Sequence, residues 1–233
     1  RRILDNLTPG WQQIGAVWLP LPHLLNMLPV QVDAWYRNGA SAVAISVLSM
    51  ALGAGALASL LLRPTGSIVA AATGAVLLMI NPNVLYLQST PMTEPLLFGL
   101  TLASIAATAA WIDDRHPTGA SDRRHANRAR DTLPGMALAA ACLTRYEAWP
   151  ITAAILALAV VVMLRRGVPL SRAVTDVVWL ARWPAIAILI FSANSRWVIG
   201  TWFVPNDFFV PENQEAIGRP LVAWRQLREG LYR

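Results

Sequence analysis

The sequence predicts an all-α protein, a polytopic transmembrane helical bundle with interfacial outer loops. Its 233 residues are 55% hydrophobic and only 14% charged, and the mean hydropathy is +0.46, whereas soluble domains carry about 25% charged residues. A helix needs about 20 mostly apolar residues to span a bilayer. Uncharged runs of near that length or longer fill residues 38–62, 64–93, 95–112 and 148–164. These observations exclude an ordinary water-soluble domain.

The basic residues support the same fold class. All 19 are arginines, set against 13 acids, for a net charge of +6. They lie mostly between or beside the apolar runs, as loop residues that flank membrane spans do. This placement argues against a nucleic-acid partner, because such proteins gather their basic residues on one face.

Residues 1–38 open the chain with a segment that cannot form one continuous span. Trp11, Trp18, Trp35 and Tyr36 are mixed there with four prolines and scattered polar groups. Aromatic rings of this kind are enriched at membrane interfaces. We therefore expect residues 1–38 to form an interfacial loop on the extracytoplasmic side.

Residues 39–200 are predicted to form the transmembrane core. The motif at 63–66 ends the first helix, and Gly53 and Gly55 within it would permit close helix contact. The prolines at 82 and 91 mark the end of the second helix. The expected spans are about 39–62, 67–88, 93–112, 134–147, 148–164 and 177–200.

The polar segments set the expected topology. Residues 113–133 contain five arginines and no apolar period, which predicts a solvated, partly disordered loop. Alternating spans place this loop with 63–66 and 165–172 on one side, and residues 201–233 form a loop on the other. Short arginine-rich loops stay in the cytoplasm. We therefore expect a multi-pass protein of the inner (plasma) membrane, and an internal piece of a longer chain.

Glu94 is the first candidate site residue. It is the only acid between residues 34 and 112, and acids at the edge of a membrane span are commonly functional. A structural role is also open, because Thr93 could cap the following helix and Glu94 would complement the positive end of the helix dipole.

Arg145 and Glu147 form the second candidate group. They are two positions apart, so they would not face each other within a continuous helix. They therefore need a helix break or partners elsewhere. Arg145 is either a phosphate ligand, for which its planar fork is suited, or an interfacial side chain that reaches the headgroups with Glu147 as its counterion.

The histidines and the cysteine carry weaker signals. His23 lies between prolines near the interface and is either a substrate-binding residue or a hydrogen-bonded structural one. His116 and His125 lie in the arginine-rich segment and are expected to be solvated. Cys142 is expected to be a small buried hydrophobic residue. The sequence contains no Cys/His cluster for a metal and no phosphate-binding glycine loop.

Three stretches together resemble the membrane-embedded GT-C glycosyltransferases, in the branch of protein O-mannosyltransferases and aminoarabinose transferases. They are WLPLPHLL (18–25), NPNVLYLQSTPMTEPLLFGL (81–100) and ALAAACLTRYEAWPI (137–151). In that family a Pro-Pro-Leu-like element follows the first outer loop, an acid tops a later helix, and a short helix ends in a Thr-Arg motif. The acidic pair of the family's first outer loop would precede Arg1, so the resemblance names no general base among these residues.

The resemblance implies a reaction and its partners. Such enzymes transfer a sugar from a polyprenyl-phosphate carrier to a protein or lipid acceptor on the extracytoplasmic side. Glu94 would then be catalytic, and Arg145, Glu147 and His23 would bind substrate. No cofactor is identified, although a divalent cation at Glu94 is left open because carboxylates suit hard cations.

Two other classes of function stay open. A secondary transporter would also contain intramembrane Arg and Glu, and it predicts broken helices near mid-membrane. A noncatalytic scaffold would dock a partner or membrane lipids through the arginine-rich segment, and Glu94 and Arg145 would then be replaceable.

Overall fold

The computed structural model describes a helical protein. It covers residues 1, 3–5, 7, 10–14, 18–116, 128–202 and 219–231, and within them every regular element is a helix. The short elements are η1 (Trp11–Gln13), α1 (Pro20–Asn26), η2 (Pro29–Gln31), α2 (Asp33–Asn38), α5 (Pro82–Gln88) and α11 (Pro220–Leu231). The longer helices are α3 (Ala40–Thr65), α4 (Ile68–Met79), α6 (Glu94–Arg115), α7 (Arg128–Cys142), α8 (Ala148–Arg165) and α9 (Leu170–Val198).

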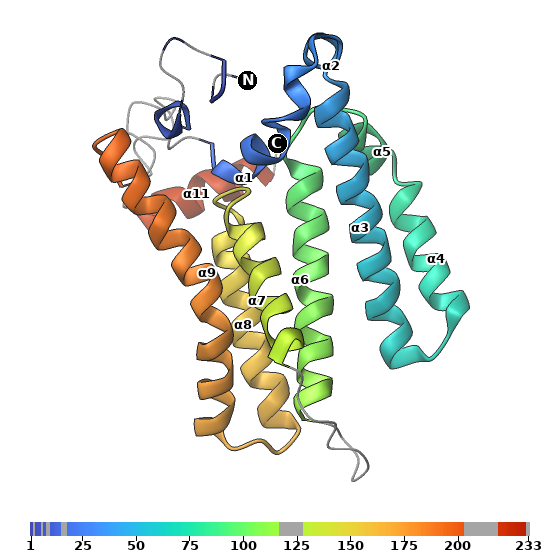
Figure 1. Ribbon diagram of the computed structural model, residues 1–233. Helices are drawn as coiled ribbons and strands as arrows, with labels where there is room; N and C mark the ends of the chain where they lie inside the picture. The colour runs from blue at the N-terminus through green and yellow to red at the C-terminus, as the bar shows by residue number, and fades with distance from the viewer. Residues whose placement is uncertain are drawn as a thin grey trace.

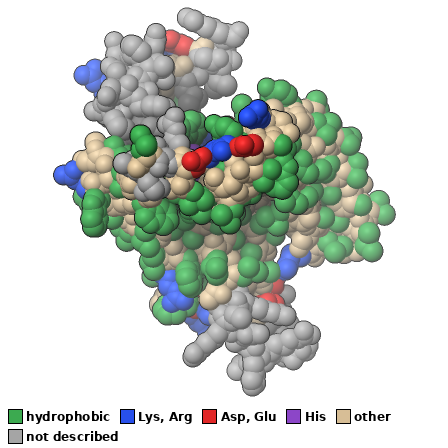
Figure 2. Space-filling view, turned by 45° about the horizontal axis from the view of Figure 1, so that its top comes forward, with side chains coloured by type: hydrophobic (Ala, Val, Ile, Leu, Met, Phe, Trp, Pro, Cys, Tyr) green, Lys and Arg blue, Asp and Glu red, His purple; other side chains and the backbone are tan. Residues whose placement is uncertain are grey.

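Four of these helices, α3, α6, α8 and α9, are long and apolar enough to cross a membrane, and a fifth span results if α4 and α5 are counted as one bent pair. Between 22% and 44% of the most apolar window of each helix is buried inside the protein. Large apolar side chains on these helices face outward, including Leu48 on α3 and Ile190 on α9, each at least 67% exposed. On the face that Figure 2 shows, hydrophobic side chains are spread widely over the surface. Apolar exposure on this scale suits hydrocarbon rather than water.

The first span is longer than expected. Helix α3 continues through Arg63 and Pro64 instead of ending at residue 62. It ends at Gly66, whose backbone is left-handed (φ 61°) and whose N–H donates to the carbonyl of Leu62 at 2.8 Å. A glycine in this conformation is a common helix stop. The proline lies too near the end to break the helix.

The second span, expected over 67–88, is not one straight helix. Helices α4 and α5 meet at an angle of 65°. Asn81 caps α5, because its side-chain oxygen accepts from the backbone N–H of Asn83 at 2.9 Å. Pro82, in the first turn, lacks the N–H that would continue α4. The Asn-Pro pair therefore ends one helix and begins another.

Three further boundaries differ from expectation. Helix α6 runs to Arg115, and α7 begins at Arg128, so the predicted loop over 113–133 is helical at both ends, while residues 117–127 lie outside the described part. The span expected over 134–147 ends at Cys142, and α7 is shorter than a full span. Helix α9 begins at Leu170 rather than near 177.

Both expected outer loops also contain helices. The segment 1–38 folds into η1, α1, η2 and α2, and the tail contains α11, while residues 203–218 lie outside the described part. Figure 1 shows α1, α2 and α5 at one end of the bundle, which we call the upper end. The α3–α4 and α8–α9 turns lie at the opposite, lower end. This is the pairing of segments that alternating spans predict.

Helix α6 is the centre of the bundle, because it packs on α3, α7 and α8. Close approach to α3 depends on small residues, with Gly53 facing the backbone of Gly99. The expected role of Gly53 is confirmed, whereas Gly55 has no atom within 4 Å of the position that a Cβ would take, and that expectation is wrong. A buried cluster joins α6 to α7, α8 and α9, and Trp111, Leu138, Met163 and Leu180 belong to it.

The orientation predicts a labelling result. With Cys142 replaced by alanine, a cysteine at Ser171 on the lower end is expected to resist a membrane-impermeant maleimide in intact cells. A cysteine at Arg37 on the upper end is expected to react, because both positions are exposed and arginine-rich loops stay in the cytoplasm. Both are expected to react once the cells are opened. The reverse pattern in intact cells would invert the topology.

Candidate functional site

The upper end brings together the three sequence stretches 18–25, 81–100 and 137–151. The backbone N–H of Leu21 in the first stretch donates to the carbonyl of Leu143 in the third at 2.9 Å. Arg145 in the third stretch contacts Thr93 and Glu94 in the second. Segments more than 50 residues apart in sequence therefore form one site.

An ion cluster is the centre of this site. Arg145 Nη1 donates to Glu94 Oε1 at 2.8 Å and to Thr93 Oγ1 at 3.0 Å. Its Nη2 donates to Glu147 Oε1 at 2.7 Å, and its Nε lies 3.2 Å from Glu147 Oε2. The guanidinium therefore bridges two carboxylates through different edges. Arg145 is the most enclosed of the three, with 24% of its side chain exposed, against 34% for Glu94 and 56% for Glu147.

A break between two helices makes the Arg145–Glu147 pair possible. Helix α7 ends at Cys142 and α8 begins at Ala148. The ring N–H of Trp149 donates to the carbonyl of Cys142 at 3.0 Å and so satisfies a group that the helix end leaves unpaired. Because residues 143–147 are not helical, side chains two positions apart can meet. The helix break that the two-residue spacing of Arg145 and Glu147 calls for is therefore present.

The start of α6 holds the opposite side of the cluster. Glu94 is in the first turn, but Thr93 makes no capping hydrogen bond with its side chain, so the expected cap is wrong. Its hydroxyl accepts from Arg145 instead, and the charged donor makes the stronger bond. Ser46 on α3 fixes the preceding turn by donating to the carbonyls of Thr90 and Met92 at 3.0 and 3.3 Å.

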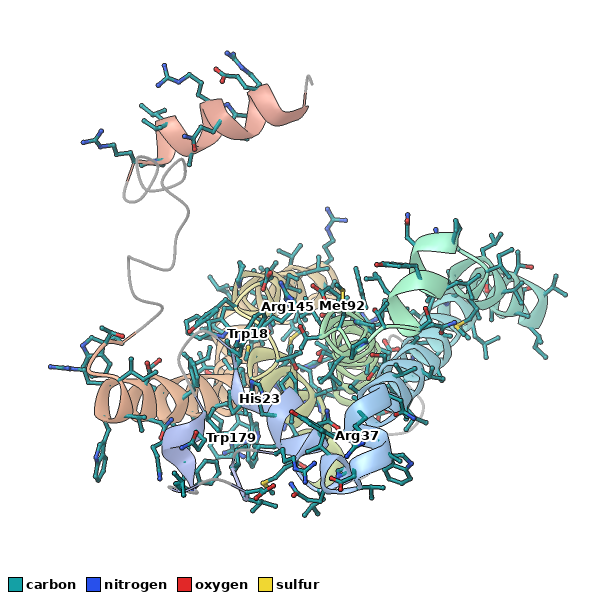
Figure 3. The ribbon with its side chains drawn as sticks, turned by 90° about the horizontal axis from the view of Figure 1, so that it is seen from above. Trp18, His23, Arg37, Met92, Arg145 and Trp179 are labelled. Atoms are coloured by element: carbon teal, nitrogen blue, oxygen red, sulfur yellow. The ribbon has the colours of Figure 1, made fainter. Side chains whose placement is uncertain are left out.

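A cavity of about 380 Å³ adjoins the cluster. His23 on α1, Ile45 on α3 and Thr93 before α6 all line it, so Thr93 belongs both to the cavity and to the ion cluster. Figure 3, which looks onto the upper end, shows Arg145 beside Met92 and His23 on α1. Loss of water around the imidazole lowers the pKa of His23. Its ring is therefore neutral near pH 7 and can accept a proton or a hydrogen bond.

The charges of the cluster bear on what it can bind. Two carboxylates surround one guanidinium, for a net charge of −1. The Nε–Nη2 edge, which would hold a phosphate, is occupied by Glu147. An incoming phosphate would have to displace Glu147, the more exposed of the two acids. Sequence reasoning offers Glu147 either as the counterion of Arg145 or as a second substrate ligand, and it does not predict that the two roles compete for the same edge of the guanidinium.

Other charged and titratable side chains fall outside the cluster. Asp5 and Asp33 both pair with Arg1. His116 pairs with Asp176 at the lower end rather than lying free in solvent, with 3.2 Å between Nε2 and Oδ2. Cys142 is fully buried, as expected. Among the residues the structure covers, no group of three or more His, Cys, Asp or Glu side chains is placed to hold a metal ion.

The fold and this site define a class of protein: an all-helical membrane-type bundle with a charged, cavity-bordered site at one end of its spans. No protein-family model, curated protein or solved structure matches the chain.

Glu147 leads to a pH prediction. Its hydrogen bonds with Arg145 lower the pKa of the carboxyl below its usual value, which is about 4.3. A depressed pKa means that the stabilisation from this pair is present above the ordinary glutamate pKa and is lost as pH falls through the lower, folded-state pKa. We expect a carboxyl ¹³C titration, assigned with Glu147→Gln, to have its midpoint below that of an ordinary glutamate. Arg145→Gln should restore the ordinary midpoint, and equal midpoints in both proteins would contradict the pairing.

Proposed function

We propose that the chain belongs to a membrane glycosyltransferase of the GT-C type, located in the plasma membrane. It would transfer a sugar from a polyprenyl-phosphate carrier to a protein or lipid acceptor on the extracytoplasmic side. The observation that carries the proposal is the convergence of residues 18–25, 81–100 and 137–151 on one site. These are the stretches in which the resemblance lies.

The proposed reaction assigns a role to each part of the site. The bond between the anomeric carbon and the phosphate oxygen breaks, the oxygen of an acceptor hydroxyl forms a bond to that carbon, and polyprenyl phosphate leaves. The proton of the acceptor hydroxyl is released to water. Arg145 offsets the charge that develops on the leaving phosphate. To do so it exchanges Glu147 for phosphate while Glu94 and Thr93 keep the guanidinium in place. Glu94 also orients the acceptor, and the cavity beside His23 receives part of the substrate.

A secondary transporter is the alternative, and the bent α4–α5 pair is the observation that favours it. Broken helices hold the substrate sites of many transporters. The ion cluster, however, lies between the start of α6 and the α7–α8 junction rather than at this bend. The scaffold alternative gives no role to a cluster next to a cavity.

Reconstitution of the whole protein in liposomes separates these functions. Supplied with a labelled polyprenyl-phosphate sugar and a membrane extract as acceptor source, the glycosyltransferase is expected to release polyprenyl phosphate and to label an acceptor. Glu94→Gln is expected to abolish release, with Asp33→Asn as the control that removes an acid from the same end. Uptake of label into the lumen without cleavage of the lipid-linked sugar would favour transport instead.

A further inference from the structure

A second cavity lies at the lower end of the bundle, far from the candidate site. Its volume is about 550 Å³. Helix α6 packs on both α3 and α8 and forms its floor. The walls are apolar, with Leu60 on α3, Ile105 on α6 and Ile155 on α8. Leu158, also in the lining, is 60% exposed, so the cavity is a groove that opens toward the surrounding medium.

Charged side chains end this groove at its lower limit. Asp113 accepts from Arg63 at 2.8 Å and from Arg166 at 2.6 Å, and all three residues line the cavity. Arg166 also donates to the carbonyl of His116. Two guanidinium groups share one carboxylate, so the group carries a net charge of +1. With 37% and 26% of the side chains of Arg63 and Arg166 exposed, both can be reached from outside.

A buried hydroxyl in the groove supplies an independent sign of a ligand. Thr108 lines the cavity and is only 4% exposed. Its Oγ1 has no hydrogen-bond partner among the described residues, although buried hydroxyls are normally paired. Thr108 lies five residues before Asp113 on α6, which is about 7.5 Å along the helix axis. A polar group of a ligand is therefore expected slightly deeper than the arginines.

We propose that this groove binds an acidic phospholipid of the bilayer. The phosphate lies against Arg63 and Arg166, the ester region reaches the level of Thr108, and one acyl chain lies along the apolar walls of α3, α6 and α8. Basic pockets between membrane helices bind anionic headgroups in this way. The net positive charge selects an acidic headgroup over a zwitterionic one, whose own cation would face two arginines. The proposal does not depend on the glycosyltransferase function.

Native mass spectrometry of the whole protein in detergent tests the proposal, with phosphatidylglycerol and phosphatidylcholine as probes. The wild type is expected to bind phosphatidylglycerol about tenfold more tightly, which is about 1.4 kcal/mol, because the net positive charge of the groove attracts an anionic headgroup. Arg63→Gln combined with Arg166→Gln should remove this preference. Arg165→Gln combined with Arg172→Gln removes the same charge from the same end, at exposed positions outside the groove, and should preserve it.

A groove-filling variant keeps the test decisive if the charge variant fails to fold. Ala154 lines the groove and is exposed, so Ala154→Phe fills the space while the arginines stay in place. This variant is expected to lower the affinity for both lipids at least fivefold. Unchanged affinity would overturn the proposal. Equal affinity of the wild type for the two lipids would also overturn the proposal. So would an equal loss of the phosphatidylglycerol preference in the Arg63/Arg166 and the Arg165/Arg172 double variants. Displacement of the lipid by millimolar glycerol phosphate would show that the site takes a free phosphate instead.

Discussion

Replacing Arg145 with lysine is expected to lower the rate of sugar transfer about 100-fold, the scale on which removal of one preorganised donor acts. Lysine keeps the positive charge but not the planar fork. A single ammonium cannot reproduce the separate edges through which Arg145 contacts Glu94 and Glu147. It therefore cannot hold Glu94 and Thr93 with one edge while the other receives phosphate. The measurement is the transfer rate at saturating lipid-linked sugar, normalised to folded protein.

Arg37→Lys is the matched control, because Arg37 lies on α2 at the same end of the bundle and is exposed. It is expected to leave the rate unchanged. A near-wild-type rate for Arg145→Lys would mean that Arg145 only anchors the chain at the interface, where a flexible ammonium reaches headgroups equally well. Glu94 would then be the remaining candidate for catalysis.

Replacing Gly99 with alanine is expected to destabilise the protein by about 3 kcal/mol. A Cβ at this position would lie 2.1 Å from the backbone oxygen of Ser49 and 3.2 Å from its Cα. Backbone atoms cannot move out of the way as the end of a side chain can, so α3 and α6 would have to separate. Overpacking typically costs about 1–3 kcal/mol, and here it affects a backbone contact of the central helix. A lower midpoint of thermal unfolding in detergent is the expected measurement.

Gly55→Ala on α3 separates packing from helix propensity. No atom lies within 4 Å of a Cβ at Gly55, so alanine there should be neutral or should stabilise the helix by up to about 1 kcal/mol. If Gly99→Ala were as stable as Gly55→Ala, the close approach of α3 and α6 would be wrong. Because Glu94 is on the same helix as Gly99, the separation is also expected to lower transfer activity.

Helix existence and order are predictable because they depend on local composition. Long uncharged runs bounded by arginine, proline and glycine place helices at α3, α6 and α8 within a few residues. The apolar segment expected near 177–200 predicts α9, but not its start at Leu170. The boundaries are less predictable. Asn81 and Pro82 lie inside one long uncharged run, although a cap and a missing donor together bend it by 65°. The start of α7 is not predictable either, because its first turn is polar in sequence and has no apolar periodicity.

The candidate site divides in the same way. Residue types and their order are enough to single out Glu94 and Arg145, because an isolated charge at the edge of an apolar run is costly and therefore informative. Alternating spans place Glu94 and Arg145 at the same end of the bundle and so predict that they approach one another, and the 2.8 Å contact confirms this. The exact atoms of that contact, and the sharing of Asp113 by Arg63 and Arg166, follow only from the packed helices. Those pairings join positions 50 to 53 residues apart, and they depend on how α3, α6 and α8 pack. Packing depends on the sum of many small contacts along whole helices, so it cannot be predicted from a local sequence pattern.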